Sequence, residues 1–290
     1  MKIRIKYYCL LVVSMMLVHP LHAQEEIGNP ILYQHNQIVK EYTRYAVSYN
    51  PQYHIPNWVA WKLTKTQTAQ KLFERDGNFS VDRNLQTSNN GVFFAEDKDY
   101  TDKGYDRGHM CPAEDNRFGY KEMEESFYTI NICPQTHNLN RGKWKALENR
   151  CRKWAEIYDS IYIVCGPILS EGEELDYFLA SDSTSRIYIP KRFFKVVLKY
   201  RDPNDKQKKK TPSNRDFQSR GMTLATLPDQ AIGYIFTMDG ESTEFMVRSV
   251  SHIEGETGIN FFPNLKNSNN IEEKISREAW PGYLLEGAVQ

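Results

Sequence analysis

The pattern of apolar and polar positions predicts five strands in the part of the chain that follows residue 50. Short runs rich in β-branched and aromatic residues, bounded by turn-forming residues, are typical of strands. Such runs occupy residues 57–64, 127–135, 160–169, 186–200 and 230–238. In the second run we expect the strand to stop at Pro134, because proline cannot donate a hydrogen bond to a neighbouring strand.

Residues 140–159 follow a helical period instead. The apolar positions recur at steps of three or four, at Trp144, Leu147, Cys151, Trp154 and Tyr158. This spacing predicts a helix of about five turns with one apolar stripe. A stripe of this kind is typical of a helix packed on a core and not of a platform for stacking bases.

The segments between these elements show weaker patterns. Residues 24–54 are expected to form an irregular or helical lead-in, and the turn-rich residues 75–91 a loop. Residues 202–210 are highly charged and predict a loop or hairpin tip, and residues 249–262 have mixed helical character. Strands and helices interleave without βαβ regularity, which predicts a single α+β domain over residues 55–290, with a mixed, largely antiparallel sheet and flanking helices.

The first residues have the pattern of a secretory signal peptide. Lys2, Arg4 and Lys6 precede the apolar run "YYCLLVVSMMLV", and "LHA" ends at Ala23. We therefore predict a signal peptide over residues 1–23. An uncleaved anchor is the alternative, but the apolar run is short for a membrane span. The mature protein is then expected to be exported to the periplasm or the outside, without stable membrane insertion.

Charge and cysteine content change this picture in two ways. Loss of the three basic residues would leave 34 Lys+Arg against 37 Asp+Glu, a net charge of −3, so any attraction to nucleic acid must come from local clusters. Four cysteines remain, which allow disulfides or buried thiols: Cys111, Cys133, Cys151 and Cys165. Only Cys133 and His137 are closely spaced among possible zinc ligands, so zinc is not expected.

Residues suited to phosphodiester hydrolysis gather between residues 105 and 148. His109 follows a glycine that allows close backbone approach, and a histidine with an ordinary pKa of about 6.5 can take a proton from water. Asn131, Asn140 and Glu148 offer oxygen atoms, which are the ligands that Mg²⁺ prefers. On a straight helix Asn140 and Glu148 would lie about 12 Å apart along the axis. If Asn140 binds the ion directly, Glu148 is therefore expected to act through water.

The order of "DRGH", "TINICPQ" and "LNRGKWKALE" resembles the DNA/RNA non-specific endonuclease family, whose core is the ββα-metal (His-Me) finger. The resemblance extends over most of residues 55–265. It implies an enzyme that uses Mg²⁺ to hydrolyse DNA and RNA without strong sequence preference and leaves 5′-phosphate ends. Mn²⁺ or another divalent cation is expected to substitute. One departure is Met110-Cys111, which places a sulfur close to the histidine.

The resemblance also implies roles for individual residues. His109 would be the general base and Asn140 the direct metal ligand. Asn131 would sit in the site and orient His109 or its surroundings, and Glu148 would bind metal-coordinated water. Arg107 would support the site.

Three further basic residues complete the expected site. The resemblance implies that Arg75 stabilises the charge that develops on phosphorus, with Arg83 as its rival in the same variable loop. Arg141 and Lys143 flank the start of the predicted helix and are expected to bind substrate phosphates. Two other readings stay open: a phosphodiesterase with another substrate, and a non-catalytic nucleic-acid-binding protein on a nuclease scaffold.

Overall fold

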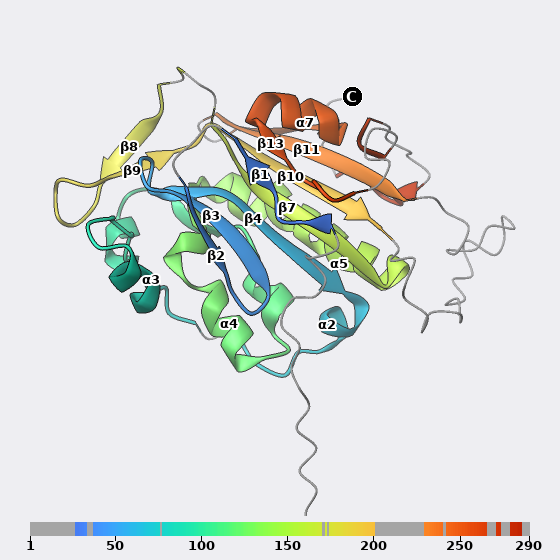
Figure 1. Cartoon of the computed structure of the whole chain (residues 1–290), viewed down its shortest axis with the longest axis horizontal. Helices are drawn as coiled ribbons and strands as arrows, with labels where there is room; N and C mark the ends of the chain where they lie inside the picture. Colours follow the sequence, from blue (N-terminus) through green and yellow to red (C-terminus); the bar gives the residue numbers. More distant parts are fainter. Residues whose placement is uncertain are drawn as a thin grey trace, which may run out of the picture.

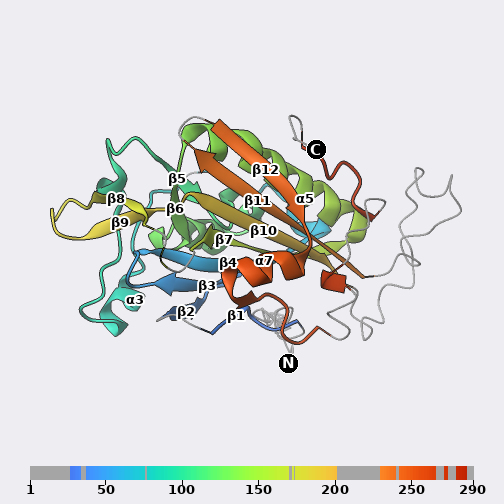
Figure 2. The same cartoon turned by 90° about the horizontal axis from the view of Figure 1, so that it is seen from above.

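A seven-stranded antiparallel sheet forms the centre of the protein. The computed structural model of the chain describes residues 27–33, 37–75, 77–169, 172, 174–200, 229–239, 242–265, 271–273 and 279–285. The strand order is β12-β11-β10-β7-β4-β3-β2, and every neighbouring pair is antiparallel. The bounds are β2 (Ile38–Glu41), β3 (Tyr45–Asn50), β4 (Ile55–Thr64), β7 (Ser160–Ile168), β10 (Arg192–Lys199), β11 (Gln230–Asp239) and β12 (Ser242–Arg248). Figure 2 shows these strands as a twisted fan.

Each face of the sheet has its own apolar core. Helix α5 (Lys145–Tyr158) covers one face; helix α7 (Val250–Thr257) and the short pair β1 (Ile31–Leu32) and β13 (Ile259–Asn260) cover the other (Figures 1 and 2). Side chains alternate between the faces, as the period of two in a strand requires. Along β7, for example, Ile163 belongs to the core under α5, and Val164 belongs to the core under α7.

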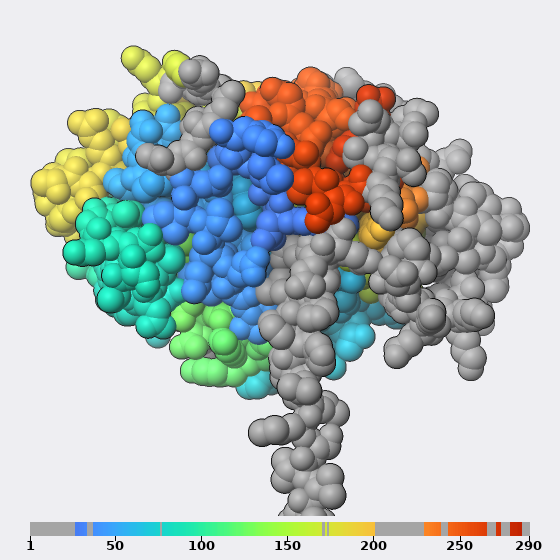
Figure 3. Space-filling model, viewed as in Figure 1, coloured from blue at the N-terminus to red at the C-terminus, as the bar shows by residue number. Residues whose placement is uncertain are grey.

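Shorter elements surround this sheet. Strand β5 (Asp106–His109) pairs with β6 (Ile132–Gln135), and β8 (Asp176–Leu179) pairs with β9 (Arg186–Ile189). The β8–β9 hairpin, drawn in yellow, forms one end of the molecule (Figure 3). The remaining helical elements are α2 (Lys65–Ala69), α3 (Arg83–Ser88), α4 (Tyr120–Ser126), η1 (Asp97–Tyr100), η2 (Ala113–Asn116), η3 (Thr129–Asn131) and η4 (Leu139–Trp144).

The predicted α+β class and the largely antiparallel sheet are confirmed. Strands β4, β7 and β11 lie where residues 57–64, 160–169 and 230–238 predict them. The predicted strand at 186–200 is two strands, because the chain leaves β9 at Pro190 and enters the central sheet as β10. None of the described helices is long and apolar enough to cross a membrane.

Four predictions of local structure were wrong. The described part of 24–54 is not mainly irregular or helical, since β2 and β3 within it extend the central sheet. The expected loop at 75–91 contains α3, whose first turn is capped by the Asp82 carboxylate. Residues 127–135 become a strand only from Ile132, and Pro134 lies inside that strand. Proline is tolerated there because β6 has a single partner strand among the described residues.

The start of the predicted 140–159 helix also differs from expectation. Regular α-helix begins only at Lys145, and residues 139–144 form a wider π-helical turn that Gly142 interrupts with non-helical backbone angles. The four cysteines are free thiols and all are buried. Residues 1–23 and 202–210, for which we predicted a signal peptide and a charged loop, lie outside the described residues.

Candidate active site

His109 ends strand β5, where it lies opposite Ile132 of β6. The preceding residue must be small, because a Cβ at Gly108 would overlap the Gln135 side chain of the partner strand. The glycine thus allows the close approach that the sequence predicted. After three intervening residues beyond β6 the chain enters the π-helical turn and then α5, so that two strands and a helix form a ββα unit.

The His109 imidazole is buried in an aromatic setting. Its ring centroid lies 5.2 Å from that of Phe79 and 5.0 Å from that of Phe127, and the residue is 6% exposed. Burial, with a smaller contribution from the positive charge of Arg75, lowers the pKa of His109 to about 3. The imidazole is therefore neutral at physiological pH, which is the form that can accept a proton.

The backbone of His109 is tied to the helix that follows. The indole Nε1 of Trp144 donates to the carbonyl oxygen of His109 at 3.2 Å. Trp144 is itself fully buried against Phe193 and Phe236, and the ammonium of buried Lys195 lies 4.0 Å from its ring centroid. Since Trp144 stands between Asn140 and Glu148, this contact fixes the histidine relative to both.

Asn140 presents an oriented side-chain oxygen. Its Nδ2 donates to Asp106 Oδ2 at 2.9 Å, and Arg141 Nε donates to the same carboxylate oxygen at 3.1 Å. Partial burial opposes ionisation of Asp106, but these two hydrogen bonds outweigh it and lower the pKa of the carboxyl. Because the amide nitrogen faces a carboxylate, the Asn140 Oδ1 must face away from it, and this oxygen accepts no hydrogen bond from the described residues.

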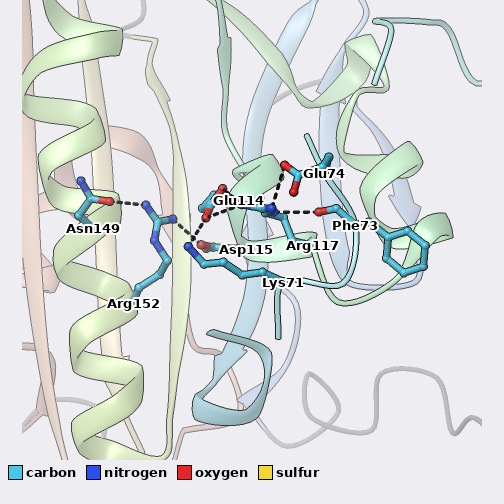
Figure 4. A network of polar contacts seen from close by, with 8 residues as sticks. All are labelled: Lys71, Phe73, Glu74, Glu114, Asp115, Arg117, Asn149 and Arg152. Atoms are coloured by element: carbon cyan, nitrogen blue, oxygen red, sulfur yellow. Dashed lines mark hydrogen bonds and ion pairs between the residues drawn. The ribbon is translucent and has the colours of Figure 1, made fainter. Parts of the chain in front are cut away.

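Glu148 is half-buried on the first turn of α5. Burial raises the pKa of its carboxyl, and the positive charges of Lys195 and Arg152 partly offset this effect. Arg152 is held in turn by the buried Asp115, whose Oδ1 lies 2.7 Å from the guanidinium, as Figure 4 shows.

A cavity of about 720 Å³ brings most of the predicted residues together. It is lined by six of them: Arg75, Arg107, His109, Asn140, Arg141 and Glu148. Its wall carries six basic side chains, adding Lys71, Lys145 and Arg152 to the three arginines, against the three acidic ones of Asp106, Glu114 and Glu148. A chain without overall positive charge thus has a local excess of positive charge in the wall of this cavity, and such an excess attracts polyanions.

Three predicted residues do not line the cavity. Lys143 lies with its ammonium 5.3 Å from the centroid of Phe245 and outside the cavity lining, so its binding of substrate phosphate stays a prediction. Arg83 forms an ion pair of 3.3 Å with Glu96, which favours Arg75 over this rival. Asn131 is fully buried behind the site.

Asn131 acts on the backbone next to His109. Its Oδ1 accepts from Cys111 N at 2.9 Å, and its Nδ2 donates to Cys111 O at 2.9 Å and to Ser126 O at 2.8 Å. Asn131 thus fixes the backbone next to His109. We expected it in the cavity, but it lies behind the cavity wall. The nearby thiol of Cys111 is buried and accepts a hydrogen bond from Asn116 Nδ2 at 3.4 Å.

Replacement of Asn131 by alanine is expected to lower the free energy of unfolding by about 3 kcal/mol, because three buried hydrogen bonds lose their partner. Thermal and urea unfolding measure the loss. Asn131→Asp should cost a similar amount, since a carboxylate would face two carbonyl oxygens. Asn89→Ala is the control, because that side chain donates a single bond on the outer helix α3. An unfolding midpoint equal to that of the wild type in Asn131→Ala would contradict this role.

Several cavity residues escaped the sequence analysis. Arg152 follows Glu148 by four residues, so the helical period alone places both on one face and could have found it. Lys145 lies one turn before Asn149 on the same helix, and both residues line the cavity, so the same period relates them. Lys71 comes from an irregular segment and Glu114 from the short helix η2, and no periodic pattern in the sequence predicts the position of either.

A ββα unit with a histidine on its first strand and an oriented amide oxygen at the start of its helix defines the ββα-metal class of protein. The family model of the DNA/RNA non-specific endonucleases matches residues 25–268. The chain therefore belongs to this family, as the sequence motifs predicted.

Individual proteins show the same relationship. The chain is 28% identical over 240 residues to the human mitochondrial nuclease EXOG, covering 81% of this chain and 60% of the relative. It is 29% identical over 232 residues to a nuclease of Nostoc sp., covering 80% of this chain and 75% of the relative. A chain in the crystal structure of the EndoG/EndoGI complex has the same fold, with a TM-score of 0.63 and 23% identity, covering 84% of this chain and 93% of the other. This chain thus spans about three fifths of the length of the EXOG relatives it matches.

Proposed function

We propose that this protein is a divalent-metal-dependent endonuclease that hydrolyses phosphodiester bonds in DNA and RNA. One observation carries the proposal: a neutral, buried histidine and an oriented amide oxygen face one cavity whose wall has a net positive charge. Hydrolysis of a phosphodiester requires a base for water and positive charge for the phosphate, and both are present. Membership in the endonuclease family supports the same reaction.

The donor atoms fit Mg²⁺. Asn140 Oδ1 would bind the ion directly, and the Glu148 carboxylate would hold its water ligands, since both are oxygen donors on the same wall. A bound ion of this kind supplies positive charge to the phosphate and to the leaving oxygen. Mn²⁺ offers similar coordination and is expected to substitute.

The protein side chains perform the remaining tasks. His109 takes the proton from the attacking water. Arg75 forms no hydrogen bond or ion pair with the described residues, so its guanidinium is available for the charge that develops on phosphorus. Arg107 is held at 2.7 Å by Asp97 and lies over the Phe79 ring that packs on His109, so it supports the base from the side. Arg141 lines the approach for the neighbouring phosphate.

Weak sequence preference follows from the chemistry of this wall. Its arginine and lysine side chains recognise phosphate, which every nucleotide carries, and such contacts fix position without reading the bases.

We also propose that the protein is exported, on the basis of the signal-peptide pattern in residues 1–23. N-terminal sequencing of the secreted protein should then begin at Gln24; an intact Met1 in the cell-associated protein would argue against export.

Incubation with supercoiled plasmid and with structured RNA tests the proposed activity. We expect nicked and then linear DNA, and shortened RNA, in the presence of Mg²⁺ and none of these products with EDTA. The ends should carry 5′-phosphates that a ligase accepts. Binding of plasmid without any cleavage would instead support a non-catalytic protein. Cleavage of small phosphodiesters alone would support a different phosphodiesterase.

A further inference from the structure

The loop that carries Arg75 has no regular structure of its own. Helix α2 ends at Ala69, and the described residues from 70 to 79 form neither helix nor strand. Arg75 itself is exposed and makes no polar contact with other described residues that would fix it. If Arg75 acts at the site proposed above, its position must therefore be set by the contacts of the two residues before it.

Arg117 binds the two residues that precede Arg75. Its Nε donates to the carbonyl oxygen of Phe73 at 2.8 Å, and its own carbonyl oxygen accepts from the Phe73 amide at 3.0 Å. One guanidinium nitrogen also lies 3.1 Å from Glu74 Oε2. Figure 4 shows the Arg117 side chain directed at this loop. Arg117 thus binds both residues immediately before Arg75.

The other side of the Arg117 fork is anchored. A second guanidinium nitrogen lies 3.4 Å from both oxygens of Glu114, and Glu114 Oε1 lies 2.9 Å from Lys71 Nζ (Figure 4). Glu114 belongs to η2, which begins four residues after His109. One guanidinium therefore ties the Arg75 loop to the segment that continues from the base.

This arrangement differs from an ordinary surface ion pair. The Arg117 side chain is only 14% exposed, and its shortest contact is to a backbone oxygen, which cannot move away as a side chain can. The planar fork of arginine is suited to holding several acceptors at once, which the lysine ammonium is not. Arg117 does not line the cavity, so it has no direct route to substrate.

We propose that Arg117 is a positioning residue for the nuclease reaction, which fixes the 71–75 loop so that the Arg75 guanidinium faces the scissile phosphate. The inference rests on the proposed function, because it assigns Arg117 an effect that passes through Arg75. It predicts that the two residues are not independent in catalysis.

A double-mutant cycle tests this dependence. Arg75→Ala should lower kcat about 100-fold, as loss of one charge-stabilising donor does. Arg117→Ala should lower kcat about 10-fold through misplacement of that donor, with KM changed less. The double variant should then be no slower than Arg75→Ala alone. Arg83→Ala is the matched control, since it removes an ion-paired arginine of the next helix and should leave kcat unchanged.

Two further measurements separate positioning from loss of fold. Native Arg117→Ala should be cut by trypsin after Arg75 faster than the wild type, while its thermal midpoint stays close to that of Arg83→Ala. Arg117→Lys repeats the cycle with the charge retained; its kcat should fall between wild type and Arg117→Ala.

The possible results lead to different conclusions. If the losses of Arg75→Ala and Arg117→Ala multiply in the double variant, Arg117 acts without Arg75 and the inference is wrong, although the proposed function stands. Wild-type activity in Arg75→Ala would overturn both the inference and the role proposed for Arg75. An unchanged rate of tryptic cleavage in Arg117→Ala would also overturn it, because the loop would then not need this arginine.

Discussion

His109→Ala is expected to lower kcat for plasmid cleavage by about 10⁴-fold, because the reaction loses its general base. The fold should survive. The His109 Nε2 has no hydrogen-bond partner among the described residues, so truncation removes no buried pair. Single-turnover cleavage at saturating Mg²⁺ measures the loss, and circular dichroism with thermal unfolding confirms that the variant is folded.

His252→Ala is the matched control for this experiment. His252 lies on α7, on the opposite face of the sheet, and its Nε2 contacts Glu256 at 2.9 Å. Its replacement should leave cleavage unchanged. Near-parental activity in His109→Ala would refute the mechanism.

The pH dependence follows from the same burial. Because the pKa of His109 in the folded, metal-free chain is lowered to about 3, the neutral base persists below the ordinary value of 6.5. As the pH drops, His109 of the unfolded chain binds a proton before His109 of the folded chain does. The free energy of unfolding should therefore fall between about pH 6.5 and pH 3, by about 1.4 kcal/mol per pH unit from this residue. His109→Ala should remove that contribution. Equal acid sensitivity of both proteins in EDTA would count against a buried, neutral imidazole.

The sequence predicted the chemistry of the site better than its shape. The motifs around His109, Asn140 and Glu148 were sufficient to identify the family, and the structure brings these three residues to one cavity. The straight helix assumed for the last two was wrong, because the chain enters α5 through a π-helical turn broken at Gly142. Turns of this kind recur at functional sites but leave no periodic pattern in a sequence.

Residues that act from a distance were harder to recognise. The Asn131 side chain carries an oxygen that could bind a metal ion, yet its three hydrogen bonds all go to backbone atoms. Only the folded chain reveals this. Lys143 and Arg141 are two positions apart and look equivalent, but the turn sends one to an aromatic ring and the other to the cavity. Arg117 gave no signal, because the two residues it holds in the loop, Phe73 and Glu74, lie more than 40 residues earlier in the chain.

Asn140→Ala is expected to raise the Mg²⁺ concentration needed for half-maximal cleavage by at least about 10-fold, the range seen when even an indirect metal contact is lost. The reason lies in the pairing with Asp106, which fixes the amide nitrogen and leaves the oxygen of this cavity-lining side chain without a partner among the described residues. Mg²⁺ titration of cleavage, with binding of Mn²⁺ followed by its paramagnetic signal, measures the change without relying on activity alone.

The companion variant Asp106→Asn tests why Asn140 is oriented. The new amide at position 106 can offer either a donor or an acceptor to Asn140, so the Asn140 amide would no longer be held in one orientation. We expect a weaker Mg²⁺ response than in the wild type, but a stronger one than in Asn140→Ala. Asn140→Asp should not restore the wild-type response, because a second carboxylate would lie against Asp106 and lose the hydrogen bond of 2.9 Å. An unchanged titration in Asn140→Ala would exclude this residue as the metal ligand and leave Glu148 as the carboxylate to examine.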